Sequence, residues 1–294
     1  MREDLELMKG AIDMHAHTEP ALFPRPYDDA DLAEQAIRYG MRGFVLKDHD
    51  MSTTGRAHYI DRMYPETQPF GAVVLNRSVG GLNPYVVESA IHYGAKVIWM
   101  PSNHSKWHSD YYDMPDYPAL GRRQKQLPGE GVTVLDPDGH LKPEVLTIVE
   151  LVAQHGVALA TGHLSLPEIK KLQDAVLDHG DVKFLVTHAN WALCKLELED
   201  QRELIAKGAY LEYVSSACVS LDFMDQDVAE LAVWIKEFDG NKLVFGSDLG
   251  QMGGPSHPEG MRMLLASLLA HGVPYDALEK MTKANPALVL GLEG

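Results

Sequence analysis

The sequence predicts an α/β fold, a (β/α)8 TIM barrel with an insertion after the fourth strand. Short apolar runs rich in Val, Leu and Ile alternate with helical patterns along the chain, as in barrels whose strands are covered on both faces. A glycine stands between a helical pattern and the next apolar run at Gly40, Gly94, Gly156, Gly180, Gly208 and Gly240. Glycine ends helices there because it adopts the left-handed conformation without steric cost. A doubly wound open sheet is the alternative, but its glycine-rich turn after the first strand is missing.

The apolar runs give the expected strands in order. Each run is continuous, which indicates strands buried on both faces, over residues 12–17, 43–49, 70–76, 95–101, 157–163, 182–188, 209–215 and 242–248. Helical patterns predict helices over residues 29–39, 53–64, 84–93, 143–155, 167–179, 198–207, 225–238, 258–271 and 275–283. We expect residues 1–294 to form a single domain.

Residues 102–142 interrupt this alternation and predict an insertion between the fourth strand and its helix. Aromatic and basic residues gather in its first half, namely Trp107, Tyr111, Tyr112, Tyr117 and the run 122–125. Residues 132–141 predict a hairpin that turns at Pro137-Asp138-Gly139. A segment this long after the carboxyl end of a strand is typical of a lid over the active face. A dimerisation arm is the other interpretation, and on that ground we expect a homo-oligomer.

Charge and composition limit the partners. The formal net charge is -16 at pH 7, so phosphate-rich surfaces would be repelled. We therefore expect a small-molecule substrate, no nucleic acid and no membrane partner. Cys194 and Cys218 are the two cysteines and have no paired spacing, which suits a reducing compartment. Without a signal-peptide pattern or a membrane-spanning apolar run, the expected location is cytoplasmic.

Several expected strands end at residues that bind metals. The first ends in His15-Ala16-His17, whose two imidazoles lie on one face because side chains alternate along a strand. The fifth, sixth and eighth strands end at His163, His188 and Asp248. Histidine and aspartate are unfavourable in strands, so their repeated appearance at these ends needs a cause. Imidazoles and a carboxylate, with one position left for water, describe a catalytic zinc-type site.

This order of ligands resembles the amidohydrolase superfamily of metal-dependent barrels, and residues 285–292 resemble its usual tail. The resemblance implies that His15, His17 and His163 hold a divalent metal. It also implies that Asp248 contacts the metal and accepts a proton from the attacking water, while His188 binds a second metal or polarises the substrate. Nitrogen and oxygen ligands suit zinc first, and also manganese, iron or nickel. We expect one tightly bound ion and leave a second ion open.

The fourth strand departs from that family. Two-metal members carry a carboxylated lysine or a glutamate at its end, where this chain has the residues WMPS at 99–102. The second strand instead ends with Lys47 and His49 on one face. A lysine that closes a buried strand is paired, modified or lowered in pKa. We interpret Lys47 as a carboxylated bridging metal ligand or as a cation that holds the substrate; the alternative is a lysine paired with Asp48 or Asp50.

Four residues are candidates for substrate binding. His49 is expected to orient the substrate from the end of the second strand. Asn76 and Arg77 close the third strand, and a guanidinium suits a substrate carboxylate. His104 lies at the start of the insertion, on the expected active face. His108 and His257 are expected on the same face, but we assign them no chemistry.

These residues predict a metal-dependent hydrolase that activates water to cleave an amide, lactone or ester bond in a small, anionic or cyclic compound. A nonoxidative decarboxylase of an aromatic or unsaturated acid is the alternative, because decarboxylases of the same superfamily resemble this ligand pattern and also lack the lysine of the fourth strand. A barrel that only binds is the third interpretation. The presence of all five strand-end ligands argues against it.

Overall fold

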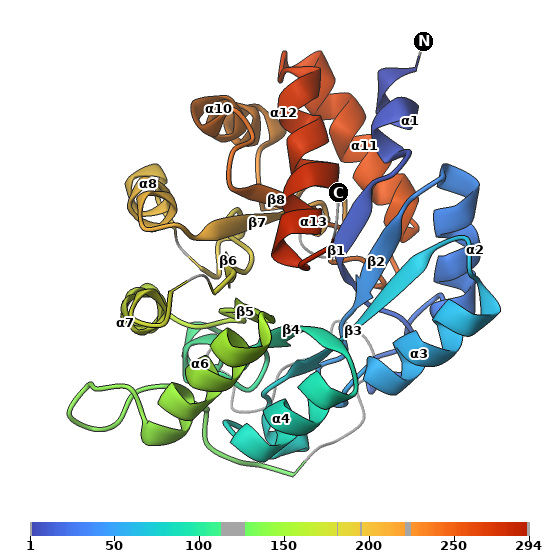
Figure 1. Cartoon of the computed structure of the whole chain (residues 1–294). Helices are drawn as coiled ribbons and strands as arrows, with labels where there is room; N and C mark the ends of the chain where they lie inside the picture. Colours follow the sequence, from blue (N-terminus) through green and yellow to red (C-terminus); the bar gives the residue numbers. More distant parts are fainter. Residues whose placement is uncertain (1, 113–126, 181, 195, 221–224, 293–294) are drawn as a thin grey trace.

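The structure is a computed structural model that describes residues 2–112, 127–180, 182–194, 196–220 and 225–292. Within these residues, eight parallel strands form one sheet in chain order (Figure 1). They are β1 (Ile12–Ala16), β2 (Gly43–Leu46), β3 (Gln68–Val74), β4 (Ala95–Trp99), β5 (Ala158–Ala160), β6 (Phe184–Val186), β7 (Tyr210–Val214) and β8 (Leu243–Gly246). Helices surround the strands, which confirms the predicted (β/α)8 barrel.

The barrel comes to closure where β8 returns to β1. Ala16 and Leu249 form a parallel bridge just beyond the two strands. The backbone N–H of His17 donates to the carbonyl of Leu249 at 3.0 Å, and that of Asp248 donates to the carbonyl of His15 at 2.7 Å. Closure therefore brings together the ends of the first and last strands, which carry three of the expected metal ligands.

The helices match the expected ones to within a few residues. They are α1 (Glu3–Met8), α2 (Asp29–Tyr39), α3 (Thr54–Met63), α4 (Pro84–His92), α5 (Lys106–Tyr111), α6 (Pro143–His155), α7 (Leu166–Leu177), α8 (Leu198–Ala206), α9 (Ser216–Val219), α10 (Val228–Phe238), α11 (His257–Ala270), α12 (Tyr275–Glu279) and α13 (Asn285–Val289), with a 3-10 turn η1 (Arg77–Val79) and a π-helical turn η2 (Lys280–Ala284). The sequence did not predict α1, α5, α9 or α13, because one or two turns are too short to show a helical period. No helix in the described ranges is long and apolar enough to cross a membrane.

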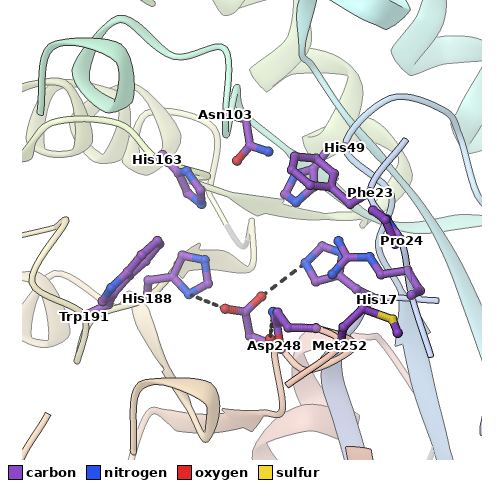
Figure 2. Close-up of a pocket in the computed structure, with 12 residues that line it drawn as sticks. His17, Phe23, Pro24, His49, Asn103, His163, His188, Trp191, Asp248 and Met252 are labelled. Carbon is purple, nitrogen blue, oxygen red and sulfur yellow. Dashed lines mark hydrogen bonds and ion pairs between the residues drawn. The ribbon is translucent and has the colours of Figure 1, made fainter. Parts of the chain in front are cut away.

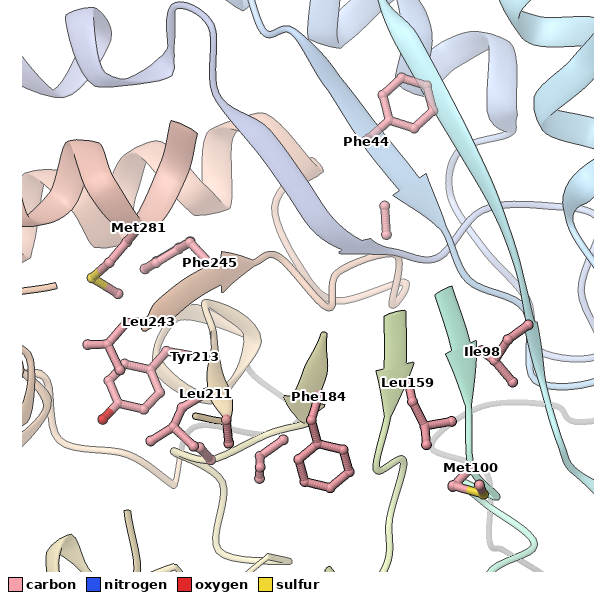
Figure 3. Close-up of a cluster of buried hydrophobic side chains, with 14 of the residues drawn as sticks. Phe44, Ile98, Met100, Leu159, Phe184, Leu211, Tyr213, Leu243, Phe245 and Met281 are labelled. Carbon is pink, nitrogen blue, oxygen red and sulfur yellow. The ribbon is translucent and has the colours of Figure 1, made fainter. Parts of the chain in front are cut away.

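Two layers of buried side chains build the barrel. The outer layer lies between strands and helices and includes Phe44, Ile98, Leu159 and Phe245 (Figure 3). The inner layer fills the barrel with Ile12, Met14, Val45, Phe70, Ala72, Val74, Val97, Trp99, Ala158, Ala160, Leu185, Tyr210 and Val244. Helix α13 packs against this inner layer, and its Asn285 donates hydrogen bonds to the carbonyls of Gly240 and Leu243 at the amino end of β8. The apolar filling leaves the carboxyl ends of the strands as the place for polar side chains.

The described parts of the insertion pack onto the carboxyl face of the barrel. Ser105 at the start of α5 forms a parallel bridge with Val132, and its hydroxyl donates to the carbonyl of His163 at 2.6 Å. The expected hairpin is reduced to a tight turn with a single antiparallel bridge between Leu135 and Leu141. Tyr117 and the basic run 122–125 lie outside the described residues.

All six predicted stop glycines have a positive φ, and two of them offer a matched test of this interpretation. A Cβ added to Gly240 (φ 68°) would lie 2.3 Å from the carbonyl oxygen of Ala277, whereas a Cβ on Gly208 (φ 95°) would meet nothing within 4 Å. We predict that Gly208→Ala lowers the free energy of unfolding by about 1–2 kcal/mol through backbone strain alone. Gly240→Ala should cost about 1–3 kcal/mol more because of overpacking.

Urea unfolding of the two variants measures both losses. Equal losses would contradict the prediction, because they would mean that α12 moves aside at no cost.

Candidate active site

The predicted strand-end residues converge on one pocket at the carboxyl face of the barrel. His17, His49, His163, His188 and Asp248 follow β1, β2, β5, β6 and β8 and line this pocket (Figure 2). The backbones of His188 (φ 57°) and Asp248 (φ 49°) are left-handed, a conformation that costs about 1–3 kcal/mol for a residue other than glycine. The fold therefore holds these two side chains at the end of their strands against a local preference.

Three ligand atoms meet at the join of β1 and β8. Nε2 of His15 lies 3.2 Å from Nε2 of His17, and Oδ1 of Asp248 lies 3.1 Å from each of them. His17 donates its Nδ1 proton to the carbonyl of Lys47 at 2.9 Å, so its Nε2 presents a lone pair. Nδ1 of His15 faces the carboxylate of Glu212 at 3.1 Å, which gives His15 the same orientation.

These three atoms fit a metal ion better than they fit one another. One proton can satisfy at most one of the three pairs, whereas a cation contacts all three acceptors. Ligand atoms of a tetrahedral zinc with bonds of about 2.0–2.1 Å lie about 3.3 Å apart, close to the separations of 3.1 and 3.2 Å seen here. In the described part of the chain, the ligand atoms of His15, His188 and Asp248 also lie within 4.8 Å of one another.

Lys47 directly follows β2 and is buried beside Trp99 of the inner layer. Its side chain is 2% exposed, its Nζ has no hydrogen-bond partner among the described residues, and this atom lies 5.2 Å from the centre of the Trp99 ring. Burial lowers the pKa of Lys47 to about 8, although Asp248 and Glu212 attract its charge. The expected alternative of a pair with Asp48 or Asp50 is wrong, because the described residues give Nζ no such partner and the carboxylate of Asp48 binds Arg56 at 3.1 Å instead.

The remaining imidazoles are held neutral and well oriented. Burial lowers the pKa of His17, His49, His163 and His188 well below the usual value for histidine. The ring of His49 stacks on His17 with centroids 4.7 Å apart, and its Nδ1 lies 2.9 Å from the hydroxyl of Ser102. Nε2 of His163 has no hydrogen-bond partner among the described residues.

Helix α5 of the insertion adds an imidazole beside this group. Nδ1 of His108 lies 2.8 Å from Nδ1 of His163, and the two rings stack with centroids 4.8 Å apart. The sequence placed His108 on the active face but gave it no role, because a single histidine in an irregular segment carries no pattern.

Three of the substrate-binding candidates do not line the pocket. Asn76 is fully buried, and it donates to the carbonyl of His49 and accepts the backbone N–H groups of Ser102 and His104. Nδ1 of His104 accepts the backbone N–H of Arg77 at 3.2 Å. The guanidinium of Arg77 donates to the carbonyl of Glu130 in the insertion at 3.2 Å. In this structure these residues connect the loops after β3 and β4, and His49 is the member of the predicted set that lines the pocket.

The sequence analysis missed several residues of the site. Glu212 of β7 is fully buried, and it is the one charged residue in the apolar run of that strand, which is the signal that could have revealed it. The loop after β1 contributes Phe23, Pro24 and Arg25 to the pocket, and the other new lining residues are Asn103, Gln251 and Met252. Loops carry no period, so little in the sequence marks these positions.

Sequence similarity links the chain to one protein family. No curated protein matches the chain by sequence. A family model described as a family of unknown function, DUF6282, matches residues 10–212.

Three solved structures superpose over nearly the whole chain. An amidohydrolase from Pseudomonas aeruginosa has 12% identity and a TM-score of 0.65, with 98% of each chain covered. A probable dipeptidase from the same organism has 11% identity and a TM-score of 0.67, with 99% of this chain and 97% of that chain covered. A PTE-like lactonase mutant from Deinococcus radiodurans has 15% identity and a TM-score of 0.58, with 98% and 97% covered. At these identities the likeness shows the fold alone, and it agrees with the predicted (β/α)8 barrel.

The buried neutral histidines predict a loss of stability in acid. Burial lowers the pKa of His257 from 6.5 to about 4, so the unfolded chain binds protons that the folded chain excludes. Their contribution is complete above pH 6.5 and is lost as the pH falls toward the folded value. For His257 alone the loss is at most about 3 kcal/mol.

Urea unfolding of the metal-free protein between pH 7 and pH 4 tests this expectation. His257→Gln should flatten the dependence of stability on pH, whereas His179→Gln, at an exposed position, should leave it unchanged. An unchanged slope in His257→Gln would show that this histidine is not held neutral.

Proposed function

This chain belongs to the family of unknown function DUF6282, and from the geometry of its site we propose that it is a metal-dependent hydrolase. The substrate is a small organic compound, anionic or cyclic, with an amide, lactone or ester bond. The observation that carries this proposal is the meeting of His15 Nε2, His17 Nε2 and Asp248 Oδ1 within 3.1–3.2 Å at the floor of a pocket. Three acceptor atoms in such an arrangement need a cation.

The proposed ion is a single divalent metal, zinc before manganese, iron or nickel. His15, His17 and Asp248 would hold it, with His163 as a further ligand from β5. A second ion would have to take its ligands from His163, His188 and Lys47. Bound at this site, a divalent ion lowers the pKa of a coordinated water toward about 7 and polarises a carbonyl oxygen.

Asp248 is the proposed proton acceptor. Burial opposes its charged form, but the ammonium of Lys47 and the hydrogen bond from Ser216 favour it, and the pKa of Asp248 is lowered below its usual value. The carboxylate is therefore ionised at neutral pH, ready to take a proton from the attacking water and pass it to the leaving group. The hydroxyl of Ser216 donates to Oδ2 at 3.0 Å, which leaves Oδ1 directed at the two histidines. His188 is neutral and would polarise the carbonyl through an N–H group.

The names of the structural neighbours support a hydrolase. The amidohydrolase, the probable dipeptidase and the PTE-like lactonase are all named for hydrolysis of an amide, a peptide or a lactone. Their common fold supplies the barrel face on which such a site stands. The same fold hosts other chemistries, so the proposal depends on the residues of this chain.

One observation favours the decarboxylase as a second candidate. Strand β4 ends at the buried Trp99, and the residues that follow it are Met100, Pro101 and Ser102. No carboxylate from this strand joins the described site, which fits a centre with one ion. Hydrolysis remains the first proposal because Lys47 and His49 are additional polar groups that a one-metal decarboxylase does not require.

Removal of the metal should abolish turnover. The purified protein, incubated with a mixture of lactones, amides and aromatic acids, is followed by mass spectrometry: a gain of water indicates hydrolysis and a loss of carbon dioxide indicates decarboxylation. A chelator should stop the reaction and zinc should restore it. Fewer than about half an equivalent of any transition metal per chain would contradict both enzymatic proposals.

Replacement of the proton acceptor should slow catalysis. Asp248→Asn should lower kcat by about 10²–10⁴-fold, because the amide cannot take up the proton. Asp178→Asn, at the exposed end of α7, is the matched control and should retain full activity. Full activity in Asp248→Asn would refute the role given to this carboxylate.

The role of Lys47 can be read from its terminal atom. A crystal structure grown with bicarbonate should show density beyond Nζ if the lysine is a carboxylated metal ligand. A free amine directed into the pocket would instead support the role of a cation that holds an anionic substrate.

A further inference from the structure

Glu212 is a charged side chain in the interior of the barrel. It is fully buried on β7, between the neighbouring strands β6 and β8. A carboxylate at such a place costs free energy unless hydrogen bonds compensate for the lost water. Its partners should therefore show why the fold keeps it.

Both oxygens of Glu212 serve residues of the proposed metal site. Oε1 and Oε2 lie 3.1 and 3.2 Å from Nδ1 of His15. Oε2 also accepts the backbone N–H of His188 at 3.3 Å. This N–H belongs to the left-handed backbone that carries His188 to the pocket, so one carboxylate contacts two residues of the site.

The space around this contact is shaped for it. A Cβ built on Gly246 of β8 would lie 2.8 Å from Cβ of His15 and 3.3 Å from Oε1 of Glu212. Any larger residue at this position would therefore push the imidazole and the carboxylate apart. Because Gly246 has no side chain, the imidazole of His15 can lie between Glu212 and the point where its Nε2 meets His17 and Asp248.

We propose that Glu212 is a positioning residue of the metal centre, which accepts the Nδ1 proton of His15 and so fixes the lone pair of Nε2 toward His17 and Asp248. The inference rests on the metal site of the proposed function and adds the residue that orients its first ligand. A carboxylate behind a ligating imidazole fixes its tautomer and raises its basicity, and the loss of such a partner weakens metal affinity by about 10–100-fold. A purely structural role for Glu212 would change stability without changing the affinity of the folded protein for metal.

Zinc affinity tests the proposal on the full chain. The dissociation constant for Zn²⁺ is measured by competition with a chromophoric chelator in the wild type, Glu212→Gln and Glu212→Asp. Glu212→Gln should bind zinc about 10–100-fold more weakly, and Glu212→Asp should recover part of the loss because it keeps a carboxylate. An affinity of Glu212→Gln within threefold of the wild type would overturn the proposal.

Glu168→Gln is the matched control. Glu168, in the first turn of α7, is another buried glutamate and is 6% exposed. Its carboxylate accepts hydrogen bonds from the hydroxyls of Thr133 in the insertion and Ser165 at the N-cap of α7. Its replacement removes a buried carboxylate without touching the pocket, so zinc affinity should stay within threefold of the wild type. A loss equal to that of Glu212→Gln would assign both effects to general destabilisation and overturn the proposal.

A second measurement needs no variant at position 212. Long-range ¹H–¹⁵N NMR of the metal-free wild type reports which ring nitrogen of each histidine carries the proton, and the spectrum of His15→Gln assigns His15. We expect the proton on Nδ1; a proton on Nε2 would overturn the proposal even if Glu212→Gln does not fold. If the wild type binds no zinc, the proposed function fails, while the tautomer of His15 still decides the inference about Glu212.

Discussion

The join between β8 and β1 is the constraint on which the site depends. Oδ1 of Asp13 accepts the backbone N–H groups of His15 at 3.0 Å and Ser247 at 2.7 Å, and the hydroxyl of Ser247 donates to the carbonyl of His15 at 2.9 Å. Burial raises the pKa of Asp13 to about 6, so the ionised carboxylate that joins the two strand ends costs free energy. In return, residues more than two hundred positions apart in the chain meet with their ligand atoms 3.1 Å from one another.

The site concentrates polar groups in a barrel that is otherwise apolar. Below it, Trp99 and the other inner residues exclude water, and burial keeps the imidazoles of His163 and His188 neutral. Neutral imidazoles are the form that binds metals, because a protonated ring has no lone pair to give. The same desolvation that weakens the metal-free protein in acid therefore prepares it for a cation.

The described part of the insertion contacts a residue of the site. Helix α5 is tied to the barrel by Ser105, and the indole of Trp107 donates to the carbonyl of Leu193 at 2.8 Å. These contacts place His108 against His163, so a segment outside the barrel repeat touches a proposed ligand. A substrate that displaced α5 would also disturb the imidazole of β5.

The sequence by itself determined the fold class and pointed to the five strand-end residues that we propose as metal ligands. Apolar runs, stop glycines and the alternation of side chains along a strand are local properties that can be recognised without knowledge of the tertiary neighbours. Only the tertiary structure decided which side chains contact and orient those residues. Glu212 comes from a strand interior and His108 from the insertion, and their partners His15 and His163 lie far away in the chain. Asn76 and Arg77 were predicted to bind the substrate because they close a strand. In the structure their side chains instead donate hydrogen bonds to the backbone of adjoining loops. Strand order fixes which ends meet, but only packing fixes where each side chain points.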